Sequence, residues 1–293
     1  MIGRSIRLNA DRAFFVVSTL FLTGFLIAVV YPFVYTINLS LSNSNAAMRG
    51  GLFLLPQGFD LGSYHTVLGS RFIWSAYVNS VFVTVLGTCL QVLFTALMAY
   101  PLSKKRMQGQ RFLNGMVVFS MLFNGGIIPT FLVVRATGLL DTHLSLMLPI
   151  LISPFNLIIL RSFFSNIPSS LEESATIDGA NDLRIFFTII IPLSKAALAT
   201  VSLWCAVFLW NDFFNALIYL QDRAKFVLPL MLREIIASTN LSDLDLQGDD
   251  MLQATAETIK AAAIVVVTLP ILLVYPFIQK YFVKGALIGS VKG

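Results

Sequence analysis

Long apolar stretches separated by short polar segments dominate the pattern of residues along this chain. A helix needs about 20 apolar residues to cross the hydrocarbon core of a bilayer, and these residues fall in continuous stretches rather than in amphipathic stripes. Six runs are long enough, at residues 13–37, 73–100, 112–134, 144–164, 186–220 and 261–283. The pattern predicts an all-α membrane protein with about six transmembrane helices.

Two of these runs need a separate interpretation. The first follows three arginines, as the apolar part of a signal peptide does, but its roughly 25 residues exceed the usual 7–15. We therefore expect 13–37 to be a retained helix. The fifth run, 186–220, is too long for one perpendicular span. Pro192 near its start predicts a lead-in along the membrane surface before the true span.

The composition agrees with a membrane protein. The 293 residues are 57% hydrophobic and only 12% charged, whereas soluble domains carry about 25% charged residues. The net charge of +5 is better explained by basic residues that fix membrane topology than by nucleic-acid binding. Because no segment outside the runs is long enough to fold alone, we interpret 1–293 as a single transmembrane domain.

Basic residues are unevenly divided between the two sides that the runs define. The side of both termini holds Arg4, Arg7, Arg12, Lys104, Lys105, Arg106, Arg111, Arg161, Arg184, Lys195, Lys280, Lys284 and Lys292 of the 20. The loop 101–111 is the densest stretch. Because basic residues concentrate in cytoplasmic loops, we expect both termini in the cytoplasm.

Two long loops then face outward, 38–72 and the segment between the last two runs. The second is acidic, with Asp243, Asp245, Asp249, Asp250 and Glu257. Charged runs usually face water, so a solvated loop is a better interpretation than a surface for an extracellular partner.

Motifs for chemistry are absent from the sequence. It has no phosphate loop of the form GxxxxGK[ST], no HExxH zinc motif and no GxSxG nucleophile elbow. His65 and His143 lie far apart in predicted loops, and Cys89 and Cys205 lie inside apolar runs. We expect no catalytic residue, no metal and no ATP hydrolysis by this chain. The functions that remain are transport and scaffolding.

The segment 168–182 is the most informative polar stretch. Ser170 followed three residues later by Glu173 has the spacing of a capping box, and Glu172 in the first turn suits the helix dipole. Gly179 supplies a residue that tolerates a left-handed stop. We expect a helix of about two turns over 171–178 on the cytoplasmic side. The spacing alone leaves open whether it is a connector or docks into another protein.

The same residues carry a resemblance. Glu173-Ser-Ala-Thr-Ile-Asp-Gly-Ala180, followed by Phe186-Phe187 and Ile189-Ile-Ile-Pro-Leu193, resembles the cytoplasmic signature of permeases of ABC importers, with Ser174 for the usual alanine. The resemblance implies a coupling helix seated on a separate ATPase, which would bind the ATP and Mg²⁺. The coupling residues it implies are Glu173, Ser174, Ala175, Asp178, Gly179 and Ala180.

Further motifs are similar to the maltose-type branch that takes up carbohydrates. They are Asn79-Ser80, Gly138-Leu-Leu-Asp-Thr142, Trp210-Asn-Asp212 and the terminal segment 284–293. The resemblance covers about residues 70–293. It implies a type I importer permease for a carbohydrate, and among carbohydrates it favours an oligosaccharide. The implied partners are a second permease subunit, an ATPase dimer and an external solute-binding protein.

Polar residues inside the fifth run are candidates for the transport pathway. Asn211, Asp212 and Asn215 lie within it, with Trp210 beside them. A carboxylate in hydrocarbon is costly, so Asp212 should face the bundle interior or water. Aromatic rings beside amides suit sugars. A polar clasp between helices, or the interfacial end of the span, are the competing interpretations and are favoured over substrate contact.

Two features leave alternatives open. Asn124-Gly-Gly-Ile-Ile-Pro129 interrupts the third run, and we expect a tolerated kink there rather than a break.

The second open alternative concerns function. An ion-coupled secondary transporter would use Asp212 as its coupling charge and need no ATPase. A non-transporting scaffold would tolerate the loss of Asp212 and Asn215.

Overall fold

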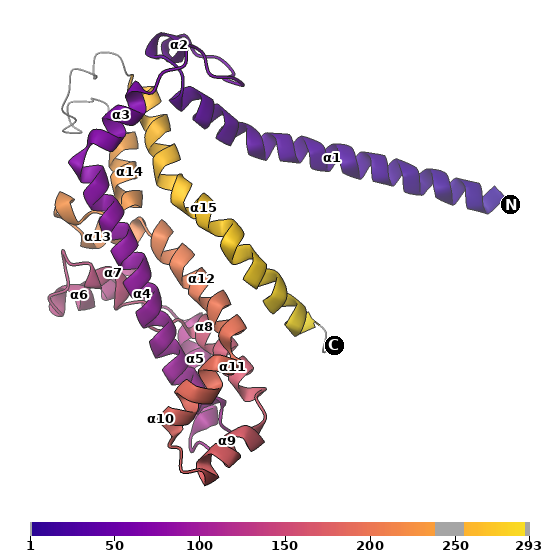
Figure 1. Cartoon of the computed structure of the whole chain (residues 1–293), viewed down its shortest axis with the longest axis vertical. Coiled ribbons are helices and arrows are strands. Elements are labelled where there is room, and N and C mark those ends of the chain that lie inside the picture. Colours follow the sequence, from indigo (N-terminus) through magenta and orange to yellow (C-terminus); the bar gives the residue numbers. More distant parts are fainter. Residues whose placement is uncertain (1, 238–254, 291–293) are drawn as a thin grey trace. The chain divides into compact units, whose positions relative to one another are not determined.

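The computed structural model describes residues 2–237 and 255–290. Throughout this part of the chain the secondary structure is helical, without a strand, which confirms the predicted all-α class (Figure 1). The elements are α1 (Ile2–Ser40), α2 (Ser44–Arg49), α3 (Gly62–Gly69), α4 (Arg71–Ser103), α5 (Gln110–Leu122), α6 (Ile127–Ala136), α7 (Leu144–Met147), α8 (Pro154–Ser165), α9 (Ser169–Ile177), α10 (Asp182–Ile185), the π-helical η1 (Phe186–Ile190), α11 (Ile191–Leu193), α12 (Lys195–Asn211), α13 (Phe214–Tyr219), the 3₁₀-helical η2 (Arg223–Lys225), α14 (Leu228–Ala237) and α15 (Ala256–Ser290).

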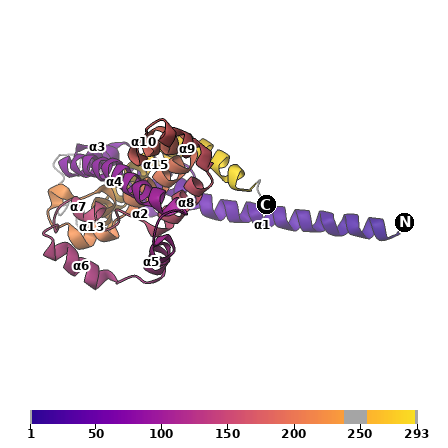
Figure 2. The same ribbon diagram turned by 90° about the horizontal axis from the view of Figure 1, so that it is seen from below.

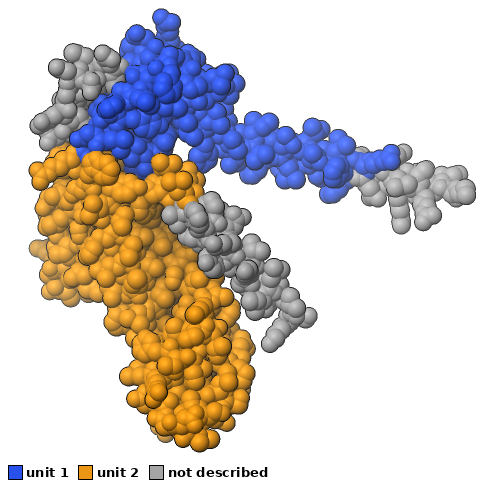
Figure 3. Space-filling model, in the orientation of Figure 1, with its two compact units in different colours: residues 1–70, 235–268 blue, residues 71–234, 269–293 orange. Residues whose placement is uncertain are grey.

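The chain divides into two compact units (Figure 3). Unit 1 comprises Met1–Ser70 and Ile235–Thr268, and unit 2 comprises Arg71–Glu234 and Leu269–Gly293. That the whole chain works as one permease domain stays a prediction. Asp243, Asp245, Asp249 and Asp250 of the acidic loop, and the last residues of the terminal motif, 291–293, lie outside the described residues.

Unit 1 has a small core and a long helix, α1, most of whose apolar side chains are exposed. Phe53 is almost fully buried, packs edge-on against Tyr35 with ring centroids 5.6 Å apart, and its carbonyl accepts a bond from the Asn38 amide at 2.9 Å. In contrast, the most apolar window of Phe14–Ser40 has no buried residue. An apolar helix exposed on all sides needs lipid or another protein around it.

Unit 2 is built on α4, which packs against both α8 and α12. Small residues on α4, such as Ala96 and Ala99, let these helices approach, and Leu160, Phe164 and Val201 fill the space between them. Phe186 in η1 joins the same core. The core therefore ties the segment after α9 to the longest helix of the unit.

Several of the predicted transmembrane runs are interrupted by bends or non-helical residues. Three helices are long and apolar enough to cross a membrane, and five spans result among the described residues if each of two bent helix pairs counts as one. Asp182–Leu193 meets Lys195–Asn211 at 84°, so a separate helical segment precedes α12; that it lies along the membrane surface stays a prediction. The expected fourth span, 144–164, is divided into α7 and α8, and Ser153 and Pro154 restart the helix as its N-cap and first residue.

The third run departs most from its prediction. The tolerated kink expected at 124–129 is wrong, because α5 and α6 meet at 111° (Figure 2). Gly126 adopts φ +89°, and its N–H is bonded by Asn124 Oδ1 at 2.9 Å rather than by a helical carbonyl. A glycine with positive φ and an Asn side chain that bonds the backbone two residues on form a turn. The helix therefore ends and restarts.

Candidate functional site

The start of α9 differs from the capping box predicted for it. The helix begins at Ser169, and Pro168 in the cap position makes no side-chain hydrogen bond. Because proline fixes φ close to the helical value, Pro168 turns the chain into the helix two residues earlier than expected. Ser170 therefore lies inside the first turn, where its carbonyl accepts a bond from Ser174 Oγ at 2.9 Å.

The end of α9 is the predicted left-handed stop. Gly179 adopts φ +82°. Its N–H donates to Thr176 O at 3.0 Å, and the N–H of Ala180 donates to Ala175 O at 2.9 Å. These two bonds form a Schellman motif, in which a glycine satisfies the last carbonyls of the helix. The sequence prediction for Gly179 is confirmed.

The inner face of α9 is held to the end of α4 by an ion pair. Glu172 is only 8% exposed, and its Oε1 pairs with Lys104 Nζ. Tyr100 Oη donates to Glu172 Oε2 at 3.5 Å, and Lys104 Nζ lies 4.6 Å from the centre of the Tyr100 ring. Breaking such a buried pair strands a charge away from water, so the helix is fixed in position.

The outer face of α9 is left open. Ile177 is 87% exposed and Leu171 is 44% exposed. The coupling residues named by the resemblance divide between the two faces. Ala175 and Ala180 pack against the core of unit 2, while the others are exposed: Glu173, Ser174, Asp178 and Gly179. The exposed set forms a continuous polar and apolar surface at the end of the helix.

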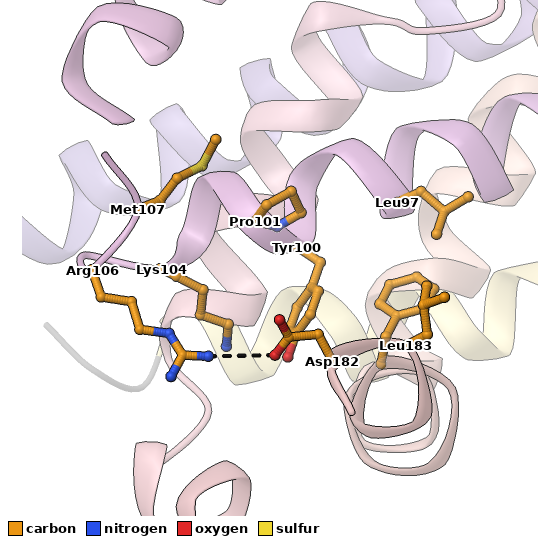
Figure 4. Close-up of a pocket in the computed structure, with 9 residues that line it drawn as sticks. Leu97, Tyr100, Pro101, Lys104, Arg106, Met107, Asp182 and Leu183 are labelled. Carbon is orange, nitrogen blue, oxygen red and sulfur yellow. Dashed lines mark hydrogen bonds and ion pairs between the residues drawn. The ribbon is translucent and has the colours of Figure 1, made fainter. Parts of the chain in front are cut away.

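A cavity of about 570 Å³ lies between the end of α4 with its following loop and the segment that begins at α10 (Figure 4). Arg106 and Asp182 face one another across it, with Arg106 Nη2 3.4 Å from Asp182 Oδ1. Both side chains are largely exposed, so this pair contributes little. Leu97, Pro101 and Leu183 supply apolar walls. The Lys104–Glu172 pair, rather than Arg106–Asp182, therefore secures α9.

The predicted pathway residues lie at a break between helices. α12 ends at Asn211, and Asp212 caps α13: its Oδ1 accepts the Asn215 N–H at 3.2 Å and its Oδ2 the Asn215 side-chain amide at 2.8 Å. The Asn211 amide bonds Val207 O within its own helix. Trp210 packs edge-on against Tyr77, with centroids 6.2 Å apart. Asp212 and Asn215 therefore meet through a cap at the break between α12 and α13.

A second polar cluster, which we name the outer clasp, binds the loop 221–228 to α4 and to the turn before α7. Asn79 Nδ2 donates to the carbonyls of Ala224 and Phe226 at 2.9 and 3.0 Å. Ser80 Oγ accepts the Leu228 N–H at 2.7 Å. The resemblance had named the Asn79-Ser80 motif without giving it a role. The structure shows that both side chains hold the loop 221–228.

Asp141 forms the other half of the outer clasp. Its Oδ1 accepts the N–H groups of Gln221 and Asp222, both at 3.0 Å, and Lys225 Nζ donates to its Oδ2 at 2.6 Å. The bond from the Asp222 backbone, followed by that from Lys225, lowers the pKa of Asp141 to about 2. Asp141 has φ +55°, a conformation that Asp adopts more readily than most residues.

These features define a class of protein: a helical membrane component whose spans are broken around polar turns and whose capped helix α9 has an exposed outer face. Among the described residues no group of three or more His, Cys, Asp or Glu could hold a metal ion. The chain belongs to the family of binding-protein-dependent transport system inner membrane components, whose pattern it matches over residues 2–287.

Known relatives resemble the chain over nearly all of its length. Protein LplC of Bacillus subtilis (strain 168) is 47% identical, with 97% of each chain covered. The polygalacturonan/rhamnogalacturonan transport system permease protein YtcP of the same organism is 48% identical, over 93% of this chain and 96% of that protein. A crystal structure of a bacterial ABC transporter that imports the acidic polysaccharide alginate matches with a TM-score of 0.86 and 36% identity, over 93% of this chain and 98% of that one.

Proposed function

We propose that this chain is one of two permease subunits of an ABC importer that carries a carbohydrate, in the form of an oligosaccharide, across the cytoplasmic membrane. Family membership makes it a component of a transport system in the inner membrane. The relatives described above act on polygalacturonan or rhamnogalacturonan and on alginate, which supports a carbohydrate cargo. ATP and Mg²⁺ would bind a separate ATPase dimer, and a solute-binding protein would deliver the cargo.

The observation that carries this proposal is the split character of α9. Its inner face is pinned to α4 through Glu172 and Lys104, while Ile177 on its outer face is 87% exposed. Apolar side chains in a rigid, exposed helix are the features of a helix that docks into a partner's groove. Closure of the ATPase dimer would then pull α9, and α4 would follow because the buried pair joins them.

Membrane orientation follows from the same region. The basic loop 101–111 supplies Lys104, which pairs with Glu172, so the loop and α9 lie at the same end of unit 2. Basic loops are cytoplasmic, so this end should face the cytoplasm, where an ATPase is found, with both termini on that side. Apolar α1, whose most apolar window within Phe14–Ser40 has no buried residue, would contact lipid or the second permease subunit.

The rival ion-coupled mechanism gives Asp212 a different task. A coupling carboxylate must exchange its ion during transport, whereas Asp212 accepts two hydrogen bonds from Asn215. A structural cap therefore accounts for this residue. A scaffold without transport does not account for the open face of α9.

Co-purification tests the proposal. The chain expressed with its neighbouring genes should bring down an ATPase and support saccharide uptake. Gly179→Val places a β-branched residue at φ +82°, which costs about 1–3 kcal/mol and should release the ATPase and abolish uptake. Gly179→Asn, which tolerates this φ, is the control. Retained ATPase and normal uptake in the Val variant would contradict the coupling role of α9.

A further inference from the structure

A second cavity, which we name the α4–α8–α12 pocket, lies between the three central helices of unit 2. It has a volume of about 440 Å³, within the usual range for small-molecule sites. Gln91 contributes the α4 wall, the first turn of α8 the second wall, and Trp204 and Phe208 the α12 wall. Gln91 lies about 18 Å along the helix from its end at Ser103, so the pocket lies well inside the span.

The hydrogen bonding of Gln91 indicates a polar ligand. The residue is 6% exposed, and its Nε2 donates to Ile150 O at 2.7 Å. Its Oε1 accepts no hydrogen bond from the described residues. A buried acceptor without a partner costs about 1–3 kcal/mol, so a ligand hydroxyl that donates to it would remove this penalty. A lipid chain or an apolar helix in the pocket would leave the penalty in place.

The first turn of α8 supplies donors on the opposite wall. Ser153 caps the helix, Pro154 follows, and the Asn156 N–H reaches Ser153 Oγ only at 3.4 Å. The Asn156 side chain is buried and donates to Cys205 Sγ at 3.3 Å. A thiol is a weak acceptor, so this amide can exchange its partner for a better one. A helix N-terminus also favours an anionic group.

Aromatic rings complete the pocket. Phe155 and Trp204 lie with ring centroids 5.8 Å apart, and Phe208 is 52% exposed. Flat aromatic surfaces bind the apolar faces of sugar rings, while polar groups around them fix the hydroxyls. No Asp, Glu, Lys or Arg lines this pocket in the described chain, so no acid repels a carboxylate near α8.

Polar oxygens continue along the same face of α4. Thr84, Thr88 and Thr95 share with Gln91 a spacing of three or four residues, which places all four on one side of the helix. Each threonine hydroxyl is buried without a hydrogen-bond partner among the described residues. These three residues do not line the pocket, but they show that the polar side of α4 is the side on which Gln91 lies.

From this geometry we infer that the α4–α8–α12 pocket is a binding site for a uronic-acid residue of the transported saccharide. The sugar ring stacks on the α12 and α8 aromatics, a hydroxyl donates to Gln91 Oε1, and the carboxylate faces the first turn of α8. The inference rests on the proposed import function and names the substrate class of this chain. The pathway residues that the sequence suggested, Trp210, Asn211, Asp212 and Asn215, do not line this pocket.

Protection of an introduced cysteine tests the site in the intact complex in lipid vesicles. Phe208→Cys, made with Cys89→Ala and with the buried Cys205 left in place, is alkylated by a maleimide, and trigalacturonate should slow the reaction about tenfold at saturation. Val207→Cys on the same helix does not line the pocket and should stay unprotected. Protection of neither cysteine, or of both equally, would overturn the site. Equal protection by maltotriose would overturn the uronic-acid class.

Variants of Gln91 then test the recognition itself. Adding Gln91→Leu should raise the trigalacturonate concentration needed for protection about tenfold. Gln91→Glu should weaken protection by trigalacturonate more than by maltotriose, because it places a carboxylate opposite the ligand's own. Gln110→Leu, which loses a comparable bond to Leu102 O, is the matched control and should change nothing. An unchanged concentration in both Gln91 variants would overturn the role of Gln91.

Two further readings separate this site from the import function and from other occupants. Protection without ATP-driven uptake by the wild-type complex would contradict the import function and support the site. Uptake without protection would contradict the site alone. A Phe208→Cys that reacts in the isolated chain but not in the complex, before saccharide is added, would show that the partner subunit fills the pocket and would overturn the proposal.

Discussion

The two ends of unit 2 are secured in opposite ways. Figure 1 places α9 at one end and α13 at the other. At the α9 end one buried ion pair, Lys104–Glu172, holds a helix whose outer face is bare. At the α13 end the outer clasp uses many hydrogen bonds, among them those of Asn79, Ser80 and Asp141, to hold a loop.

Under the proposed function, the difference separates an end that would transmit motion from an end that closes the fold. A loop held by many separate bonds keeps most of them when one is removed, and its polar groups are satisfied within the unit. A helix held by one charged pair moves as a rigid body with the helix it is pinned to, and its exposed side chains remain available to a partner. We therefore assign motion to the α9 end and shape to the outer clasp.

Removing one charge of the inner pair should have the largest effect. Glu172→Leu leaves Lys104, whose side chain is 17% exposed, without its partner, and breaking a buried pair costs about 3–5 kcal/mol. Thermal unfolding of the purified chain should show the loss. The double variant Lys104→Met/Glu172→Leu removes both charges and should regain most of the stability. A double variant as unstable as the single one would show that packing, not charge, holds α9.

The second-largest effect is expected from a change on the outer face of α9, which should weaken ATPase binding without changing stability. Ile177→Asp puts a charge at a position that is 87% exposed, so stability should not change. Burying an isoleucine at an interface is worth about 1.5–3 kcal/mol, so ATPase binding should weaken by about tenfold or more. Ile177→Val is the conservative control. Undiminished binding of the ATPase by Ile177→Asp would remove Ile177 from the docking surface.

The outer clasp should respond to single changes with smaller losses. Ser80→Ala leaves the buried Leu228 N–H without its 2.7 Å bond, at a cost of about 1–3 kcal/mol. Ser75→Ala removes an exposed bond to Ala224 O and should cost much less. Unfolding midpoints of the two variants give the comparison. Equal losses would mean that burial does not decide the strength of the clasp.

Local rules predicted part of this arrangement from the sequence. The stop at Gly179 follows from one residue's tolerance of positive φ, and the separate segment before α12 follows from Pro192. Ser170 did not cap its helix, because Pro168 had already set the backbone. The break at 124–126 was taken for a kink, since the sequence does not tell whether Asn124 bonds the helix or the turn.

Contacts between distant segments were beyond such rules. Glu172 and Lys104 are 68 residues apart, and each had a sufficient local explanation, one as a first-turn acid and the other as a topology signal. Asp141 and Lys225 pair over 84 residues. Gln91 is a single amide in an apolar run, and no local rule distinguishes it. Its meaning depends on which helices pack around it, which only the tertiary fold provides.

The smallest effect expected is that of pH on the outer clasp. The pKa of Asp141 is lowered to about 2, below its unfolded value of about 3.9. Its contribution is therefore complete above about pH 4 and is lost as pH falls through 2. Hydrogen bonding to Asp141 raises the pKa of Lys225, so that contribution is lost only as pH rises above about 10.4.

The Asp141–Lys225 pair should thus be insensitive to pH across the physiological range. Asp141→Asn keeps an acceptor and tolerates φ +55°, but it cannot titrate. Unfolding midpoints between pH 5 and 2 should fall for the wild type and fall less steeply for the variant, while at pH 7 the two should differ only by the lost charge. Parallel curves for the two proteins would show that other carboxylates, not Asp141, set the acid limit of this fold.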